Sequence, residues 1–405
     1  MSEKPERQVR RRRVFYIPGY DPFPPRRYRE LYRAEGARQA KISGYELAVA
    51  AKPAGRHYGW RATALTGGQE SRAEIVVLVW ADIVRASMAA GVARTYLLLL
   101  RTAWTYLSTG ALARLVRLRQ GPVIAAMYPV VMLLGQLALA LLAAWAVYRL
   151  GGRVVPGWLS GAAGLALVPL ILQQFRRIDG KLFAYYLLHD YAFTAQERGA
   201  NPPELEARIA GFAHDIAAAL DSDADEVLVV GHSSGAHLGV SIVADVIRAG
   251  AVRVGGPELA LLTLGQAIPM QSFLPSAARL RGDLAFLAGS DALTWVDVSA
   301  PGDGCTFALC DPVSVSGVAP EGKRWPLVIS AAFSRTLRPE TWRRNKWRFF
   351  RLHFQYLRAF DNPGDYDYFA ITAGPRFLSD RFAGHAPSPS RKETPLSPHT
   401  AVGAP

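Results

Sequence analysis

The chain of 405 residues lacks several features that would assign it to a familiar class. It has only two cysteines, Cys305 and Cys310, which are too few for a disulfide framework and indicate a reducing compartment. Met1–Arg13 is polar and arginine-rich, so we expect no cleavable signal peptide there. None of the eight histidines shows a metal-ligand spacing, and the cysteines have no histidine near them in sequence. We therefore expect no metal and no cofactor.

Acidic residues are missing from one long stretch. Between Ile83 and Ile178 there is no Asp or Glu, whereas the same span holds ten arginines. These arginines account for most of the net charge of +14, which by itself would suggest nucleic acid as a partner. This span is also the most apolar part of the chain, and arginines beside apolar segments are typical of an anionic membrane surface. Membrane lipids are thus the predicted partner, and nucleic acid is not.

Two segments within this span contain no charge at all. Pro122–Tyr148 has 27 residues and Val154–Phe175 has 22. As helices they would measure about 40 and 33 Å, against a hydrocarbon core of about 30 Å. The pattern predicts a transmembrane hairpin with helices 122–148 and 154–175, and the larger number of flanking basic residues places its outer ends in the cytoplasm. The alternative is a buried helical hairpin that caps a soluble domain.

The residues before this hairpin also have helical character. Met88–Leu118 reads as a helix with Leu97, Leu100 and Trp104 among its apolar residues and with Arg94 and Arg101 on one face. A basic amphipathic helix of this kind is typical of a membrane interface. A surface helix of a soluble domain is the alternative.

An alternation of strand-like and helix-like runs surrounds the apolar span and predicts an α/β domain. The segments 14–87 and 181–384 form its two parts, 88–180 forms the membrane region, and 385–405 is expected to be a disordered tail. The predicted strands are Val14–Pro18, Tyr45–Ala50, Tyr58–Leu65, Glu74–Trp80, Val227–Val230, Leu259–Leu264, Leu293–Ser299 and Pro326–Phe333, and the predicted helices of this domain are Tyr28–Lys41, Leu205–Leu220, Ala236–Ala249 and Trp342–Phe350.

The sequence Gly231-His232-Ser233-Ser234-Gly235 lies between an apolar strand and a helical segment. A strand, a tight turn and a helix are the setting of a nucleophile elbow, in which glycines two residues before and after the serine leave room for a strained turn. Ser233 is therefore the candidate nucleophile. A G-x-S-x-G pattern alone is weak, and an ordinary glycine-rich turn is the alternative.

Three further positions complete a candidate site. Asp303 lies in a Gly/Pro loop after a strand, where a carboxylate can reach a histidine, and Asp297 within that strand is the runner-up. His353 follows the last predicted strand and precedes the tail, which makes it the candidate general base. The backbone N–H groups of Tyr20, in the turn Pro18-Gly19-Tyr20, and of Ser234 are the candidate oxyanion donors.

The motifs YIPGYD and GHSSGAH, with the order Ser233, Asp303, His353, give the chain a resemblance to a membrane-anchored bacterial member of the α/β-hydrolase superfamily, over residues 14–82 and 183–380. Trp295–Pro312 and His353–Tyr356 are distantly similar to the acid and histidine regions of lipases and DDHD-type phospholipases. The resemblance implies a mostly parallel sheet with helices on both faces, interrupted by the inserted transmembrane hairpin. It also implies that Asp303, rather than Asp297, is the triad acid.

These observations together predict a serine carboxylic-ester hydrolase of the esterase or lipase type that acts on a hydrophobic ester or acyl substrate. We expect it in the inner membrane of the cell, multi-pass, with the catalytic domain facing the cytoplasm. The alternative function is a non-catalytic membrane scaffold that retains the hydrolase fold. A nucleic-acid-binding function rests only on net charge and is disfavoured by the position of that charge.

Overall fold

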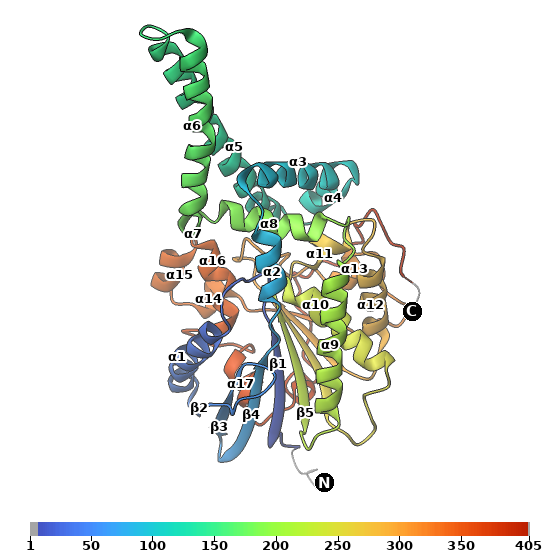
Figure 1. The fold of residues 1–405 in the computed structure, drawn as a ribbon. Coiled ribbons are helices and arrows are strands. Elements are labelled where there is room, and N and C mark those ends of the chain that lie inside the picture. The colour runs from blue at the N-terminus through green and yellow to red at the C-terminus, as the bar shows by residue number, and fades with distance from the viewer. Residues whose placement is uncertain (1–6, 404–405) are drawn as a thin grey trace, which may run out of the picture.

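A mixed sheet of eight strands forms the centre of the protein, for which a computed structural model describes residues 7–403. The strand order is β2-β3-β4-β1-β5-β6-β7-β8 (Figure 1). Strands β4, β1, β5, β6, β7 and β8 run parallel, and β2 and β3 continue the sheet as antiparallel strands. The strands are β1 Arg11–Ile17, β2 Glu46–Ala51, β3 Gly59–Thr66, β4 Gln69–Val77, β5 Glu226–His232, β6 Glu258–Leu264, β7 Thr294–Ser299 and β8 Leu327–Ser330.

Helices cover both faces of this sheet. In β5, Val227 and Val229 pack against one face with side chains of α9, α10 and α12, whereas Leu228 and Val230 pack on the other with side chains of α1, α16 and α17. All seven β5 residues are buried, which explains why this strand reads as a continuous apolar run. The bounds of these helices are α1 Arg26–Ser43, α9 Pro203–Leu220, α10 Gly235–Arg248, α12 Ala278–Gly289, α16 Phe349–His353 and α17 Tyr368–Ala373.

The apolar span is an insertion into this domain. Strand β1 pairs with β4 on one side and with β5 on the other, so residues from before and after the span interleave in one sheet. Helices α5 (Gln120–Gly151) and α6 (Gly157–Arg177) form a hairpin that projects beyond the carboxyl ends of the parallel strands (Figure 1). Both are long and apolar enough to cross a membrane. Their packing is close, since a Cβ at Gly164 would lie 2.5 Å from the carbonyl oxygen of Ala144.

The prediction of one helix over 88–118 is wrong. The structure has α2 (Ala81–Met88), α3 (Val92–Ser108) and α4 (Ala111–Leu118), and α2 and α3 are bent by 103° at their junction. Glycines mark both breaks: Gly91 is extended before α3, and Gly110 has φ of 72° before α4. Helix α3 keeps the expected amphipathic character, with Leu97, Leu100, Trp104 and Leu107 all exposed on one side.

Two expectations for the C-terminal part also fail. The helix expected over 342–350 is interrupted, with α15 (Pro339–Asn345) and α16 separated by three residues, and this break brings His353 into the region described below. The tail from 385 to 403, expected to be disordered, packs along the domain through backbone hydrogen bonds. The amides of Lys392, Leu396 and Gly403 donate to the carbonyls of Leu309, Val315 and Ala278 at 2.7, 3.0 and 2.8 Å.

Candidate active site

Ser233 lies in a sharp turn between β5 and α10. Its φ of 58° is in the left-handed region, which is strained for a residue with a side chain. The flanking glycines are required by sterics: a Cβ at Gly231 would lie 2.5 Å from the carbonyl oxygen of Gly235, and one at Gly235 would lie 2.2 Å from that of Ile17. The Ser233 amide is held by the Leu264 carbonyl at 2.9 Å. The turn thus has the geometry of a nucleophile elbow.

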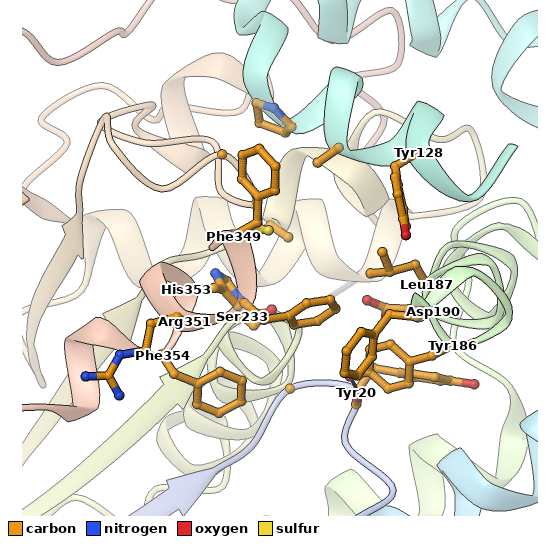
Figure 2. A pocket seen from close by; sticks show the side chains of 18 of the residues that line it. Tyr20, Tyr128, Tyr186, Leu187, Asp190, Ser233, Phe349, Arg351, His353 and Phe354 are labelled. Atoms are coloured by element: carbon orange, nitrogen blue, oxygen red, sulfur yellow. Dashed lines mark hydrogen bonds between the residues drawn. The ribbon is translucent and has the colours of Figure 1, made fainter. Parts of the chain in front are cut away.

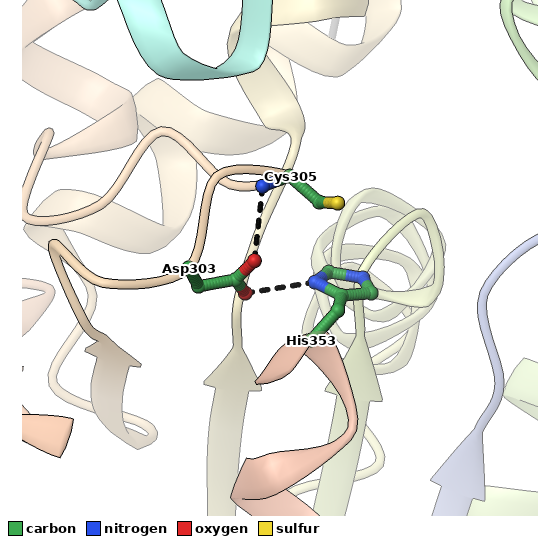
Figure 3. A group of neighbouring side chains, drawn as sticks. All are labelled: Asp303, Cys305 and His353. Atoms are coloured by element: carbon green, nitrogen blue, oxygen red, sulfur yellow. Dashed lines mark hydrogen bonds and ion pairs between the residues drawn. The ribbon is translucent and has the colours of Figure 1, made fainter. Parts of the chain in front are cut away.

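Asp303 and His353 form a buried pair. Asp303 Oδ2 lies 2.8 Å from His353 Nδ1, and Asp303 Oδ1 accepts a hydrogen bond of 2.9 Å from the Cys305 amide (Figure 3). Burial lowers the pKa of His353, but the charge and hydrogen bond of Asp303, with a smaller contribution from Asp190, outweigh it and raise the pKa overall. The carboxylate fixes the ring and leaves Nε2 free to act on a proton.

Ser233 and His353 line the same cavity, of about 680 Å³ (Figure 2). The ring of His353 packs against that of His232, the residue before Ser233, at 4.8 Å between ring centroids. Ser233 Oγ and His353 do not form a hydrogen bond in this structure, and such bonds often tighten only when substrate is bound. The structure therefore brings together the serine, the histidine and Asp303 that the sequence singles out.

Asp297, the second candidate for the acid, does not contact His353. Asp297 lies within β7 and accepts a hydrogen bond from Thr263 Oγ1 at 2.6 Å. Burial raises its pKa to about 7, and it has no hydrogen bond or ion pair with His353. Asp297 is thus a buried carboxyl of the sheet, separate from the histidine.

The two predicted oxyanion donors, the backbone N–H groups of Tyr20 and Ser234, have no hydrogen-bond acceptor among the described residues. Gly19 lies directly against the serine, since a Cβ there would be 2.9 Å from Ser233 Cβ. The loop is held in place because Trp80 Nε1 donates to the Pro18 carbonyl at 2.9 Å. Both N–H groups remain available to a bound ligand.

The cavity also contains a carboxyl group that sequence reasoning missed. Asp190 lies on α8 (Ala184–Ala195), and Ser234 Oγ donates to its Oδ1 at 3.4 Å. Burial raises the pKa of Asp190 to about 7, against smaller opposing effects of His353 and Ser234. The sequence did contain a signal for this residue, because Asp190 is the single acid in the largely apolar run 182–195. This pattern is typical of a charged residue that faces a protein interior.

Other histidines near the elbow are neutral. His232 Nε2 donates to the His353 carbonyl at 2.9 Å, and burial, followed by the nearby His353, lowers its pKa to about 3. Burial lowers the pKa of His237 to about 4. His232 lines the cavity, whereas His237 is buried outside it.

Cys305 lies beside the acid–histidine pair, a proximity that sequence spacing did not indicate. Ligand atoms of Asp303, Cys305 and His353 all lie within 4.8 Å of one another (Figure 3). Nitrogen, sulfur and oxygen donors at this distance are a set that zinc accepts. However, burial and then the Asp303 charge raise the pKa of the Cys305 thiol well above its usual value, which disfavours the thiolate that a metal requires.

No family model, curated protein or solved structure matches the chain.

Proposed function

We propose that the protein is a membrane-anchored serine hydrolase of the α/β-hydrolase type that cleaves a carboxylic ester. The observation that carries the proposal is the strained Ser233 turn at the same sheet edge and in the same cavity as His353, whose ring is paired with Asp303. The nucleophile follows β5, the acid follows β7 and the histidine follows β8, which is the chain order of this superfamily.

The reaction uses each residue in a defined role. Ser233 Oγ attacks the acyl carbon while His353 Nε2 takes its proton, and the N–H groups of Tyr20 and Ser234 stabilise the oxyanion. The bond between the acyl carbon and the leaving oxygen then breaks, and His353 returns the proton to the alcohol. A water molecule, deprotonated by His353, then attacks the acyl carbon, and the bond between this carbon and Ser233 Oγ breaks. His353 returns the proton to Oγ as the carboxylic acid leaves. Asp303 orients the ring and stabilises its charged form throughout.

The position of the charges supports a membrane location. Helices α5 and α6 are the proposed transmembrane pair, with the hydrolase domain in the cytoplasm. Arg114, Arg117, Arg119, Arg176 and Arg177 outnumber the two arginines at the far end of the hairpin, Arg149 in the last turn of α5 and Arg153 in the loop. The exposed apolar side of α3 lies beside the base of the hairpin, where an interfacial helix would contact lipid (Figure 1).

A fluorophosphonate probe tests the serine. We expect the purified wild-type protein to label covalently and the Ser233→Ala variant to remain unlabelled, with Ser222→Ala, a half-buried residue before β5 that does not line the cavity, as the control. A folded wild-type protein that resists labelling would contradict the proposal and favour a scaffold that has kept the hydrolase fold.

A further inference from the structure

The hairpin contributes part of the cavity wall as well as an anchor. Ile124, Ala125 and Tyr128 of the first turns of α5 line the cavity that holds Ser233 and His353. Figure 2 shows Tyr128 on the hairpin side of this space, with Ser233 and His353 across from it. Attachment to a membrane alone would not require a helix that borders Ser233.

This wall is firmly joined to the domain. Tyr128 Oη donates to the Leu182 carbonyl at 2.6 Å, and Tyr96 Oη donates to the Leu133 carbonyl at 2.9 Å. Gly121, near the start of α5, lies against Gly304 of the acid loop, where an added Cβ would be 3.8 Å from Gly304 Cα. The position of the cavity relative to the bilayer is therefore set by the hairpin itself.

The rim of the cavity exposes large apolar side chains. Ile124, Trp347 and Phe349 are 67%, 75% and 48% exposed and all line the cavity. Ile124 lies in the first turns of α5, and Trp347 and Phe349 lie just before and at the start of α16. Such a cluster is unfavourable in water and favourable against acyl chains. The rim is thus suited to contact with acyl chains.

Two cations border the same rim. Lys181 and Arg348 line the cavity, are exposed, and form no ion pair with any carboxylate of residues 7–403. Unpaired cations at the level of the lipid headgroups attract negatively charged headgroups. The apolar rim and these cations together match an amphiphile with an acyl chain and an anionic headgroup.

We propose that the substrate is an acyl ester of an anionic membrane lipid, which enters laterally from the leaflet between α5 and the segment 347–350. Its acyl chain lies against the hairpin wall, its carbonyl reaches Ser233, and its headgroup stays near Lys181 and Arg348. The volume of about 680 Å³ lies within the range of about 300–1,000 Å³ that is usual for ligand sites. The inference rests on the proposed hydrolase function and specifies its substrate.

Filling the entrance tests the route. Ala125 and Ala126 are both half-buried on the same turn of α5, but only Ala125 lines the cavity, so Ala125→Trp and Ala126→Trp form a matched pair. We expect Ala125→Trp to reduce hydrolysis of a long-chain anionic lipid ester in vesicles by about tenfold or more, with less than about a twofold change for p-nitrophenyl acetate in water. Ala126→Trp should match the wild type on both. An Ala125→Trp enzyme equal to Ala126→Trp on the lipid, or equally impaired on both esters, overturns the lateral route.

The rim is tested by a second matched pair, Trp347→Ala and Trp158→Ala. Both tryptophans are about equally exposed, at 75% and 74%, but Trp158 lies on α6 and does not line the cavity. Only Trp347→Ala should lower turnover of the vesicle substrate, by a similar factor for anionic and zwitterionic lipid esters because the indole is uncharged, whereas a Lys181→Gln, Arg348→Gln protein should lose turnover of the anionic ester alone. Equal effects of the two substitutions contradict the inference.

Binding is measured separately from catalysis in the Ser233→Ala protein. An anionic phospholipid with a photoreactive diazirine in its acyl chain should crosslink to 121–128 and 347–354, and Ala125→Trp should suppress this crosslinking. Absence of crosslinking overturns the lateral route even if the wild type hydrolyses soluble esters. Crosslinking without hydrolysis by the wild type supports the lipid cavity and rejects the hydrolase function instead.

Discussion

At the residue scale, the pairing of one carboxylate with His353 is the feature on which the proposed chemistry depends. Asp303 and Asp297 are six residues apart in sequence and both buried, yet only Asp303 bonds to the ring. Asp297 Oδ1 accepts a hydrogen bond from Thr263 Oγ1. Burial raises the pKa of Asp297 and so favours its neutral form. The two carboxyls therefore have different roles that substitution can separate.

Asp303→Asn should lower kcat by about 10³–10⁴-fold, because an amide cannot hold the required tautomer of His353 or stabilise its positive charge. Asp297→Asn should leave kcat within about twofold of the wild type, since it replaces a buried carboxyl that makes no contact with the histidine. Ester hydrolysis at pH 8 is the measurement. A large loss in Asp297→Asn with an active Asp303→Asn would reverse the assignment.

Asp190 makes the pH profile informative. Its pKa of about 7 means that it is neutral at lower pH and ionised at higher pH, and its negative charge helps to raise the pKa of His353. Catalysis begins from neutral His353, so activity falls as pH drops through the pKa of the histidine. Asp190→Asn removes the charge and should move the acidic limb of the kcat/KM profile to lower pH. Glu197→Gln, an exposed change beyond α8, should not move it, and an unchanged Asp190→Asn profile would contradict the coupling.

At the element scale, the hairpin and α3 are the elements that would contact a bilayer in the proposed membrane location. Helix α3 presents Leu97, Leu100 and Trp104 outward, whereas its other side packs against α8 through Leu99 and Leu188. Helix α8 in turn carries Asp190 into the cavity. Helix α8 therefore separates α3 from the candidate site, whereas α5 lines the cavity directly.

Cysteine accessibility tests the predicted orientation. Val154, in the loop between α5 and α6, is 86% exposed, and Val254, in the loop before β6, is fully exposed. In intact cells an impermeant maleimide should label Val154→Cys but should label Val254→Cys only after permeabilisation. The protein without these substitutions controls for Cys305 and Cys310, of which Cys310 is buried. Labelling of Val254→Cys from outside would place the hydrolase domain on the opposite side.

At the scale of the whole molecule, the two parts of the α/β domain depend on each other. Strand β1 lies between β4 and β5, and the buried Arg12 guanidinium bonds to Glu226 of β5 as well as to the Gly374 and Arg376 carbonyls, both at 2.6 Å. Removal of either ionic partner would leave the other buried and uncompensated. The chain before the hairpin is thus required at the centre of the sheet.

A fragment of residues 181–405 should therefore fail to fold. Without β1, the fully buried strand β5 becomes an exposed edge and Glu226 loses its cation, a combination that favours aggregation. Limited proteolysis and size-exclusion chromatography, with the full chain in the same detergent as the control, provide the measurement. A monodisperse, protease-resistant fragment would show that the second part folds independently.

The sequence by itself determined the features that depend on neighbouring residues. The strands of the sheet, the serine turn and the two apolar helices could be predicted because periodicity, glycine sterics and uninterrupted apolar length act locally. Two predictions from local pattern were wrong. Gly91 and Gly110 divide a stretch that was predicted as one helix, and the tail, predicted to be disordered, is ordered by contacts with Leu309 and Val315.

Only the tertiary structure decided which distant groups meet. His353 reaches Asp303 across 50 residues of chain, Asp190 enters the cavity from a helix that follows the hairpin, and Cys305 comes to lie beside the histidine. The placement of α5 against the site was likewise not determined by the sequence, which left open a transmembrane anchor or a buried hairpin that caps the domain. These contacts follow from strand order and helix packing, which join segments far apart in the chain, and no local pattern encodes them.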